Sequence, residues 1–256
     1  MNRTPRTLTL IATALLAAAG AAQAQQTIDH NKALAGNITP GDAPGYPITI
    51  TRSGHYKLMG NLTVPAGLQA IFIQADDVTL DLNGFTVAGP GTCVRAANRA
   101  VTCQGNASQL PGITDPFTAA QGVVVRNGTV RGFGYGISLS GSAIVQDMFL
   151  TQNAISGVSV ANGRVDRVVA MLNGLSGVTI GRGTVANSVA NNNGQQGVIR
   201  LGDNPSALVV DTVAQGNFAL GIQGPSVRGT LLHDNGQTNR NAIRSLGGNA
   251  DANGVY

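Results

Sequence analysis

The chain has 256 residues, of which 43% are hydrophobic and 11% charged, with 35 glycines, two cysteines, no tryptophan and no glutamate. The apolar content excludes a disordered chain, and the glycine content excludes a long helical protein, because glycine is a poor helix former. The formal net charge of +4 falls to +2 without Arg3 and Arg6, and the other arginines are scattered with few aromatics between them. This pattern predicts no nucleic-acid partner.

Residues 1–24 have the pattern of a secretory signal peptide. A basic start is followed by an apolar stretch from Leu8 to Ala22 and by the small-x-small cleavage pattern Ala22-Gln23-Ala24. The stretch is short for a transmembrane helix and no second apolar run follows, so we expect no membrane span after cleavage. The protein is therefore expected to be exported, to the periplasm or to the extracellular space.

The next segments predict a cap and the first strands of the fold. Residues 25–47 are rich in Pro and Gly near their end, and we expect them to cap the first turn, since an unpaired strand edge invites aggregation. Between residues 48 and 90, segments such as Ile48-Thr49-Ile50 and Val78-Thr79-Leu80 alternate apolar and polar residues. This alternation predicts short β-strands.

Residues 90–120 interrupt the regular pattern as one long excursion, which contains three of the ten prolines and both cysteines. Cys93 and Cys103 are expected to form a disulfide in an oxidising compartment, which would stabilise the chain by roughly 2–3 kcal/mol. A long loop on a rigid scaffold can carry function or can cover an exposed edge, and the sequence leaves both interpretations open.

An internal repeat of about 20 residues organises the remainder. Glycines followed by alternating apolar residues recur at spacings of 21, 20, 20 and 24: Gly136, Gly157, Gly177, Gly197 and Gly221. An asparagine stands four residues before each of the last four glycines: Asn153, Asn173, Asn193 and Asn217. Two further columns follow from the same alignment: Val125, Val145, Val165, Val185, Val209 and Val227, and Thr129, Phe149, Val169, Val189, Val213 and Leu231.

This repeat predicts an all-β fold, a single-stranded right-handed parallel β-helix (solenoid) with ~20-residue rungs over residues 48–245. The column from Val125 to Val227 and a further apolar column, Ile137, Val158, Val178, Val198 and Ile222, are expected to fill a narrow interior. The Asn column is expected to form a structural ladder of amides that hydrogen-bond from rung to rung. The polar column that contains Asp147 and Asp211 falls at a turn, where Asp is common. Residues 246–256 are predicted to be a C-terminal tail.

The run from Asp77 to Phe85, followed after the excursion by the run from Arg126 to Gly134, resembles bacterial exported right-handed parallel β-helix repeat proteins of the pectin-lyase-like superfamily. The resemblance covers roughly residues 45–245. It implies a polysaccharide partner, because characterised members act on acidic polysaccharides as lyases, hydrolases or epimerases, or serve as surface and phage adhesins. The same fold supports many activities, so the resemblance does not assign one.

A search for catalytic groups finds no recognisable site. On one strand, Asp77 and Asp81 would lie about 13 Å apart, which is too far for one ion or for the paired carboxylates of a glycosidase. The alignment places Val124 beside Asp81 and Ala120 beside Asp77, so no second acid is expected nearby. The Arg-x-Pro-x-x-Arg and Asp-His motifs that the resemblance to pectate lyases would imply are missing. We therefore expect no metal site and no cofactor, with calcium needed only if the protein is a lyase.

Three hypotheses remain. The first is an exported β-helix that binds polysaccharide, with Arg126, Arg131, Tyr135, Asp77 and Asp81 as candidate ligand-binding residues. The second is a polysaccharide lyase or glycoside hydrolase with an unrecognised site, so enzymatic activity stays open. The third is a purely structural envelope or surface protein. The sequence does not determine the oligomeric state.

Overall fold

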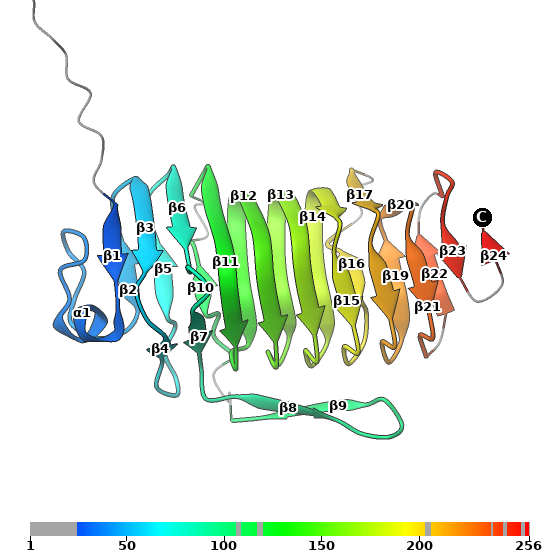
Figure 1. The fold of residues 1–256 in the computed structure, drawn as a ribbon, viewed down its shortest axis with the longest axis horizontal. Coiled ribbons are helices and arrows are strands. Elements are labelled where there is room, and N and C mark those ends of the chain that lie inside the picture. Colours follow the sequence, from blue (N-terminus) through cyan, green and yellow to red (C-terminus); the bar gives the residue numbers. More distant parts are fainter. Residues whose placement is uncertain are drawn as a thin grey trace, which may run out of the picture.

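The computed structural model describes residues 25–105, 109–116, 120–202, 206–236, 238–242, 245–251 and 254–255. The predicted signal peptide, residues 1–24, lies outside the described residues. The described chain is a right-handed parallel β-helix of about nine turns with rungs of about 20 residues, which confirms the predicted fold class (Figure 1). Helix α1 (His30–Ala35) lies at the N-terminal end of the coil.

The strands form three parallel sheets, called faces A, B and C here, and the long strands β11 (Val123–Arg131), β12 (Tyr135–Thr151), β13 (Ser156–Met171) and β14 (Ser176–Ala186) each bend through two or three of them. Face A also contains β2 (Ile48–Ile50), β5 (Ile71–Ile73), β10 (Ile113–Thr114), β16 (Val198–Arg200), β19 (Leu220–Gly224) and β22 (Thr238–Ala242).

Face B also contains β1 (Gln26–Ile28), β3 (Gly54–Leu58), β6 (Val78–Asp81), β17 (Ala207–Val210) and β20 (Ser226–Arg228). Face C also contains β4 (Leu62–Thr63), β7 (Thr86–Ala88), β15 (Val189–Asn191), β18 (Val213–Gln215), β21 (Leu231–His233) and β23 (Ala250–Asp251). The last strand, β24 (Gly254–Val255), pairs with β23 in antiparallel fashion.

The interior is filled by like residues stacked from rung to rung. The predicted valine column from Val125 to Val227 lines the inside of face B, and all six of its members are fully buried. The column from Ile137 to Ile222 lines the inside of face A and is also fully buried. The column from Thr129 to Leu231 is aligned as expected but points outward from face C: Phe149 is 39% exposed and Leu231 is 45% exposed, so its valines do not fill the interior as stacked Val and Ile were expected to do.

The turns from face B to face C use the left-handed backbone region. Asn127, Asp147, Asn187 and Asp211 all have φ between 47° and 61°, a conformation that Asn and Asp tolerate better than other side chains. Arg167 occupies the same place in its rung with φ of 50°. Arginine gains nothing from this backbone region, so its side-chain contacts must offset the cost.

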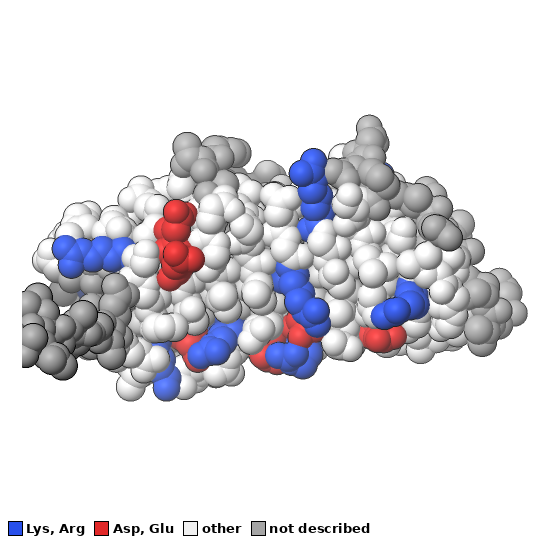
Figure 2. Space-filling view, turned by 90° about the horizontal axis from the view of Figure 1, so that it is seen from above, with Lys and Arg blue, Asp and Glu red and all other residues white. Residues whose placement is uncertain are grey.

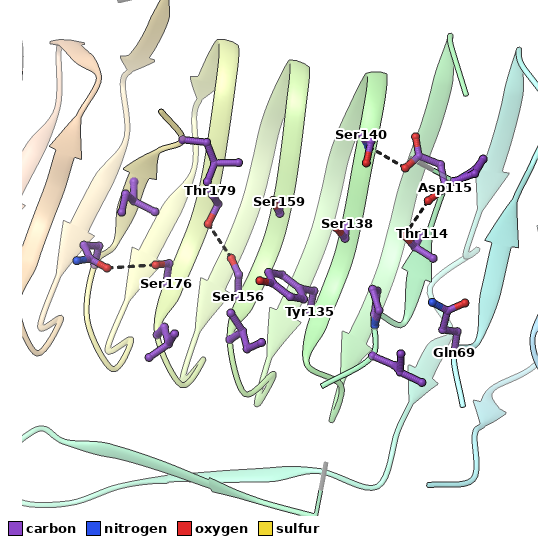
Figure 3. A pocket seen from close by; sticks show the side chains of 18 of the residues that line it. Gln69, Thr114, Asp115, Tyr135, Ser138, Ser140, Ser156, Ser159, Ser176 and Thr179 are labelled. Atoms are coloured by element: carbon purple, nitrogen blue, oxygen red, sulfur yellow. Dashed lines mark hydrogen bonds between the residues drawn. The ribbon is translucent and has the colours of Figure 1, made fainter. Parts of the chain in front are cut away.

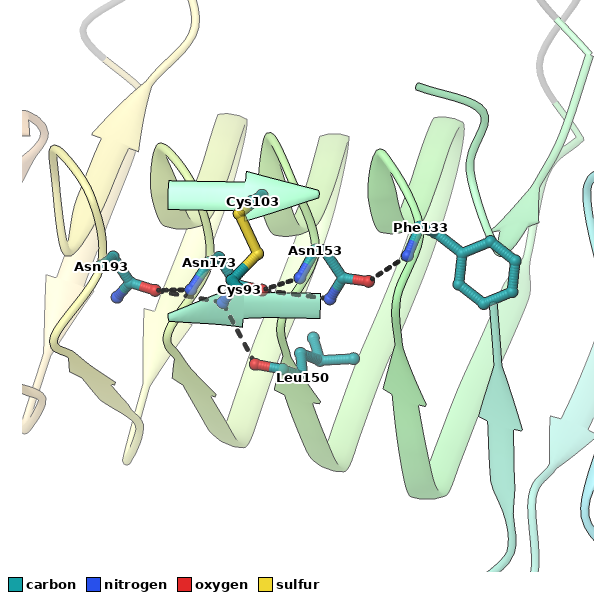
Figure 4. Close-up of a disulfide and its surroundings, with 7 residues drawn as sticks. All are labelled: Cys93, Cys103, Phe133, Leu150, Asn153, Asn173 and Asn193. Carbon is teal, nitrogen blue, oxygen red and sulfur yellow. Dashed lines mark hydrogen bonds between the residues drawn. A yellow bond between two sulfur atoms is a disulfide. The ribbon is translucent and has the colours of Figure 1, made fainter. Parts of the chain in front are cut away.

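The Asn column forms a continuous buried ladder at the turns from face C to face A (Figure 4). Oδ1 of Asn173 accepts hydrogen bonds from the backbone N–H and from the amide of Asn153, both at 3.1 Å. Asn173 donates in turn to Oδ1 of Asn193 at 3.1 Å, and Asn193 donates to Oδ1 of Asn217 at 3.0 Å. The amides of Asn173, Asn193 and Asn217 each donate a second hydrogen bond to a backbone carbonyl of a preceding strand. Both N–H groups of the Asn173 and Asn193 amides therefore have acceptors.

The excursion contains an antiparallel hairpin, β8 (Thr92–Arg95) and β9 (Val101–Gln104), that lies alongside the coil (Figures 1 and 4). Cys93 and Cys103 face each other across it and are joined by a disulfide. We call residues 91–105 the strap. Its root is held by a hydrogen bond from the Gly91 N–H to the Gly132 carbonyl, and at its tip Arg99 donates to the Asp234 carbonyl at 2.6 Å.

Candidate binding groove

A groove of about 880 Å³ crosses the outer surface of face A (Figure 3). Its floor consists of the outward-pointing residues of six successive rungs, which the sheet register aligns in one row: Phe72, Thr114, Ser138, Ser159, Thr179 and Ile199. Six parallel strands about 4.8 Å apart make this row about 24 Å long. The groove therefore runs along the axis of the coil.

A second polar row lies beside the floor, at the start of the face-A strands. Tyr135, Ser156 and Ser176 are register partners on three successive rungs. Ser156 Oγ and Thr179 Oγ1 share a hydrogen bond of 3.1 Å, and Ser176 Oγ donates to Gln196 Oε1 at 3.2 Å. These bonds fix part of the polar surface of the groove.

Other hydroxyls in the groove are available to a ligand. Within the described ranges, the side chains of Ser138, Ser159 and Tyr135 make no hydrogen bond with the protein, and all three are half-buried. A hydroxyl both donates and accepts, so each can exchange hydrogen bonds with a ligand hydroxyl.

The two lips of the groove are largely apolar. One lip is formed at the turns that lead from face C to face A, and Leu110, Pro111, Ile155 and Leu175 lie there. The opposite lip includes Pro116 and Leu201. Leu175 is 38% exposed and Leu201 is 47% exposed, so both offer apolar surface to whatever occupies the groove.

Asp115 is the single charged side chain among the described residues that line the groove. It is 6% exposed, and its two carboxylate oxygens accept hydrogen bonds from the backbone N–H groups of Ser140 at 2.7 Å and of Gly141 at 3.0 Å. Asp115 thus holds the backbone of the next rung in place where that rung passes from face A to face B. Its carboxylate is already occupied, which disfavours a role as catalytic acid or base.

Of the five candidate ligand-binding residues, the structure places only Tyr135 in the groove. Arg126 and Asp81 lie on face B and form an ion pair, with Arg126 Nε 3.1 Å from Asp81 Oδ2. Asp77 occupies a turn with φ of 52°, and Arg131 is on face C between Ala88 and Thr151. The sequence therefore identified one groove residue and four residues that lie elsewhere.

The Arg126–Asp81 pair corrects the expected alignment. Asp81 is the register partner of Arg126, not of Val124, although Thr86 pairs with Thr129 as the sequence predicts. The turn after Asp81 is two residues longer than the turn after Arg126, and this difference shifts the register on face B only. For the same reason Asp77 lies beside Gly122 and not Ala120.

Face B carries a second group of ion pairs. The guanidinium of Arg167 donates to Asp147 at 2.6 and 2.8 Å and also contacts Asp166, which accepts a further bond from Arg164 at 2.9 Å. The hydrogen bond from Arg167 lowers the pKa of Asp147 below its usual value. Burial raises the pKa of Asp166, but hydrogen bonds from Asn187 and Arg164 outweigh burial, so the pKa is lowered overall. Seen from above, blue and red side chains meet in groups along one edge, and most of the visible surface is white (Figure 2).

A smaller cavity of about 200 Å³ lies near the N-terminal end and is lined by Thr39, Arg52 and His55 among others. It is below the usual size of a ligand pocket. Within the described ranges, no group of three His, Cys, Asp or Glu side chains is close enough to hold a metal ion. The same part of the chain contains no helix that is long and apolar enough to cross a membrane.

The sequence contains a pattern from which the missed residues of the groove floor could have been predicted. Ser138, Ser159 and Thr179 each stand two residues after a repeat glycine, between two inward-facing apolar residues, so their outward direction follows from strand alternation. The lips had no comparable signal, because they depend on how the turns and the end of the excursion fold around face A.

Fold and groove together define the class of this chain: a parallel β-helix with an elongated groove on one face, with hydroxyl side chains on its floor and largely apolar lips. No protein-family model matches the chain, and no curated protein matches it. Among solved structures, it is similar to the A-module of the mannuronan C-5 epimerase AlgE4 from Azotobacter vinelandii, with 14% sequence identity and a TM-score of 0.45. The match covers 74% of this chain and 62% of the epimerase module. At this level of similarity, neither activity nor substrate can be transferred.

Proposed function

We propose that this protein is an exported β-helix that binds a polysaccharide in the groove on face A, with no catalytic step at that groove. The observation that carries the proposal is an open groove about 24 Å long in which hydroxyl side chains recur on successive rungs. A site that extends over six rungs suits a polymer better than a compact small molecule.

The chemistry of the lining supports a sugar ligand. Sugar hydroxyls both donate and accept, as do the hydroxyls of Ser138 and Ser159 and the amides of Gln69 and Gln195 in the groove. The C–H faces of sugar rings are apolar and pack on aromatic and aliphatic side chains, which Phe72, Tyr135 and the two lips provide.

Binding is favoured over catalysis by the shortage of acid–base groups. General acid–base chemistry on a glycosidic bond requires two positioned titratable groups. Among the described lining residues, only Asp115 and Tyr135 have side chains of an acid–base type, and both oxygens of Asp115 accept backbone hydrogen bonds. Asp81, Asp147 and Asp166 of face B are held in ion pairs with arginine and are not among the described residues that line the groove.

Export is part of the proposal. The disulfide between Cys93 and Cys103 suits an oxidising compartment such as the periplasm or the extracellular space. Residues 1–24 would direct the chain there and be removed.

The proposal is tested by measuring dissociation constants for a panel of soluble polysaccharides with isothermal titration calorimetry. We expect Tyr135→Ala to weaken binding about tenfold, the effect of losing a central aromatic contact. Phe149→Ala is the matched control, because Phe149 is also exposed but lies on face C, and it should change binding less than twofold.

Equal effects of the Tyr135 and Phe149 substitutions would remove the groove from consideration. Incubation with each polymer should leave its reducing-end content and its ultraviolet absorbance unchanged. Chain cleavage or an unsaturated product would favour the lyase or hydrolase alternative.

A further inference from the structure

We infer that the groove selects an uncharged polysaccharide and discriminates against polyanions such as polyuronates; this inference rests on the proposed function. The starting observation is where the chain places its positive charges. A site for an acidic polymer holds each carboxylate with Arg or Lys, which bind it through charge-assisted hydrogen bonds. No Arg, Lys or His occurs among the described residues that line the groove.

The arginines that form ion pairs or hold the strap lie in other parts of the molecule. Arg126, Arg164 and Arg167 are on face B in ion pairs with Asp81, Asp147 and Asp166. Arg95 and Arg99 are on the strap, where they donate to Gly216 and Asp234. Lys57 is on β3 of face B, beside Asp81. Four of the five ion pairs among the described residues therefore lie on face B or at the turns that leave it, and Arg200, although it is on β16 of face A, is not among the residues that line the groove.

The one charge that lines the groove has the wrong sign for a polyanion. Asp115 is held in place by the Ser140 and Gly141 N–H groups, so it cannot swing away from an approaching carboxylate. Like charges repel, and the apolar lip residues Pro116 and Leu201 on the same side reduce the screening by water. An acidic polymer would also lose hydration against these lips without gaining a cation in return.

The remaining lining matches an uncharged chain. Hydroxyls from Thr114, Ser138, Ser159 and Thr179 recur at the rung spacing of about 4.8 Å, so a linear polymer that lies along the axis meets one of them on each of the four central rungs. Tyr135 and the apolar lip at Ile155 and Leu175 flank the same rungs and can pack against sugar rings. The proposed ligand class is therefore a linear polymer of neutral sugars.

The experiment compares two forms of one backbone: polygalacturonate, which is anionic, and the same polymer with its carboxyl groups fully methyl-esterified, which is neutral. A neutral β-glucan is the third ligand. At low ionic strength we expect the wild-type protein to bind at least one neutral polymer ten times or more tightly than polygalacturonate. Raising the salt to 0.5 M should leave neutral binding within twofold, because screening does not affect uncharged partners.

Two variants at the centre of the floor complete the design. Ser159→Arg adds a cation and should raise affinity for polygalacturonate at least tenfold, while Ser159→Gln, similar in reach but neutral, should not. Polygalacturonate binding by the wild type that equals or exceeds neutral binding, and that Tyr135→Ala removes, would overturn the inference about ligand class and leave the groove as the binding site. Failure to bind any polymer of the panel would overturn both the inference and the proposed function.

Discussion

The Asn ladder offers the sharpest test of what stabilises this coil, through the substitution Asn173→Ala. Asn173 is fully buried, and its Oδ1 is the acceptor for both the backbone N–H and the amide of Asn153. After the substitution, the Asn153 N–H has no acceptor, and its amide keeps only the Val130 carbonyl at 3.4 Å. Two buried donors that lose their acceptor cost about 1–3 kcal/mol each, so the free energy of unfolding should fall by about 2–6 kcal/mol.

The measurement is urea unfolding followed by far-ultraviolet circular dichroism with the disulfide intact. Asn162→Ala is the matched control, since Asn162 lies in β13, the strand that precedes the turn of Asn173, is half-buried and has no side-chain hydrogen bond within the described ranges. It should change stability by no more than about 0.5 kcal/mol. If Asn173→Ala costs no more than this control, the ladder contributes nothing to stability and the reasoning fails.

The variant Asn173→Asp separates hydrogen bonding from packing. It keeps Oδ1 but turns a second oxygen toward the Leu150 carbonyl and the Asn193 Oδ1, which are both acceptors. Burial without a cation raises the pKa of such a carboxyl, and protonation restores one of the two lost donors. The variant should therefore regain stability as the pH falls from 7 toward 5, and a flat profile would argue against the ladder geometry.

Two further predictions concern face B. Arg167 has φ of 50°, and both Arg167→Asn and Arg167→Val lose its ion pairs, so the difference between the two variants isolates the backbone. Asparagine is tolerated in this region, as at Asn127 and Asn187 of the same turn column, whereas a β-branched residue is strained, so Arg167→Val should be less stable than Arg167→Asn by about 2 kcal/mol in urea unfolding. Equal effects of the two would show that the backbone region is not the cause. The pKa values of Asp147 and Asp166 are lowered in the folded protein, so their stabilisation is present above about pH 4 and is lost as the pH falls through the lowered values. Arg167→Asn should therefore flatten the loss of stability between about pH 4 and pH 2, as followed by thermal unfolding, and an unchanged slope would contradict that assignment.

Most of the fold could be predicted from the sequence because each rung repeats the same chemistry at the same place. The Asn column and the column from Val125 to Val227 stack as their spacing of about 20 residues requires. Apolar character alone, however, does not tell an inward column from an outward one, and the column of Phe149 and Leu231 points to solvent. The register beside Asp81 was missed because turn length, which the repeat does not fix, differs by two residues there.

The groove was harder to predict than the coil. Tyr135 was identified from its aromatic side chain beside Arg131, yet the two residues lie on different faces. A single serine has no feature that marks it as a binding residue, so the row of serines was not recognised from the sequence. Its significance depends on the sheet that aligns Ser138 with Ser159 and on lips that are built by turns and by the end of the excursion.

The strap has a consequence for how this protein can change length. Coils of this kind ordinarily grow or shrink by gaining or losing whole turns, since each turn touches only its neighbours. Here Arg99 reaches Asp234 across 135 positions of sequence, and Arg95 reaches Gly216 across 121. One additional turn between root and tip would carry both acceptors about 4.8 Å beyond the guanidinium groups. The length of the hairpin therefore matches the number of turns between Gly132 and Asp234, and a lineage that adds a turn within this span must lengthen the hairpin to keep both contacts.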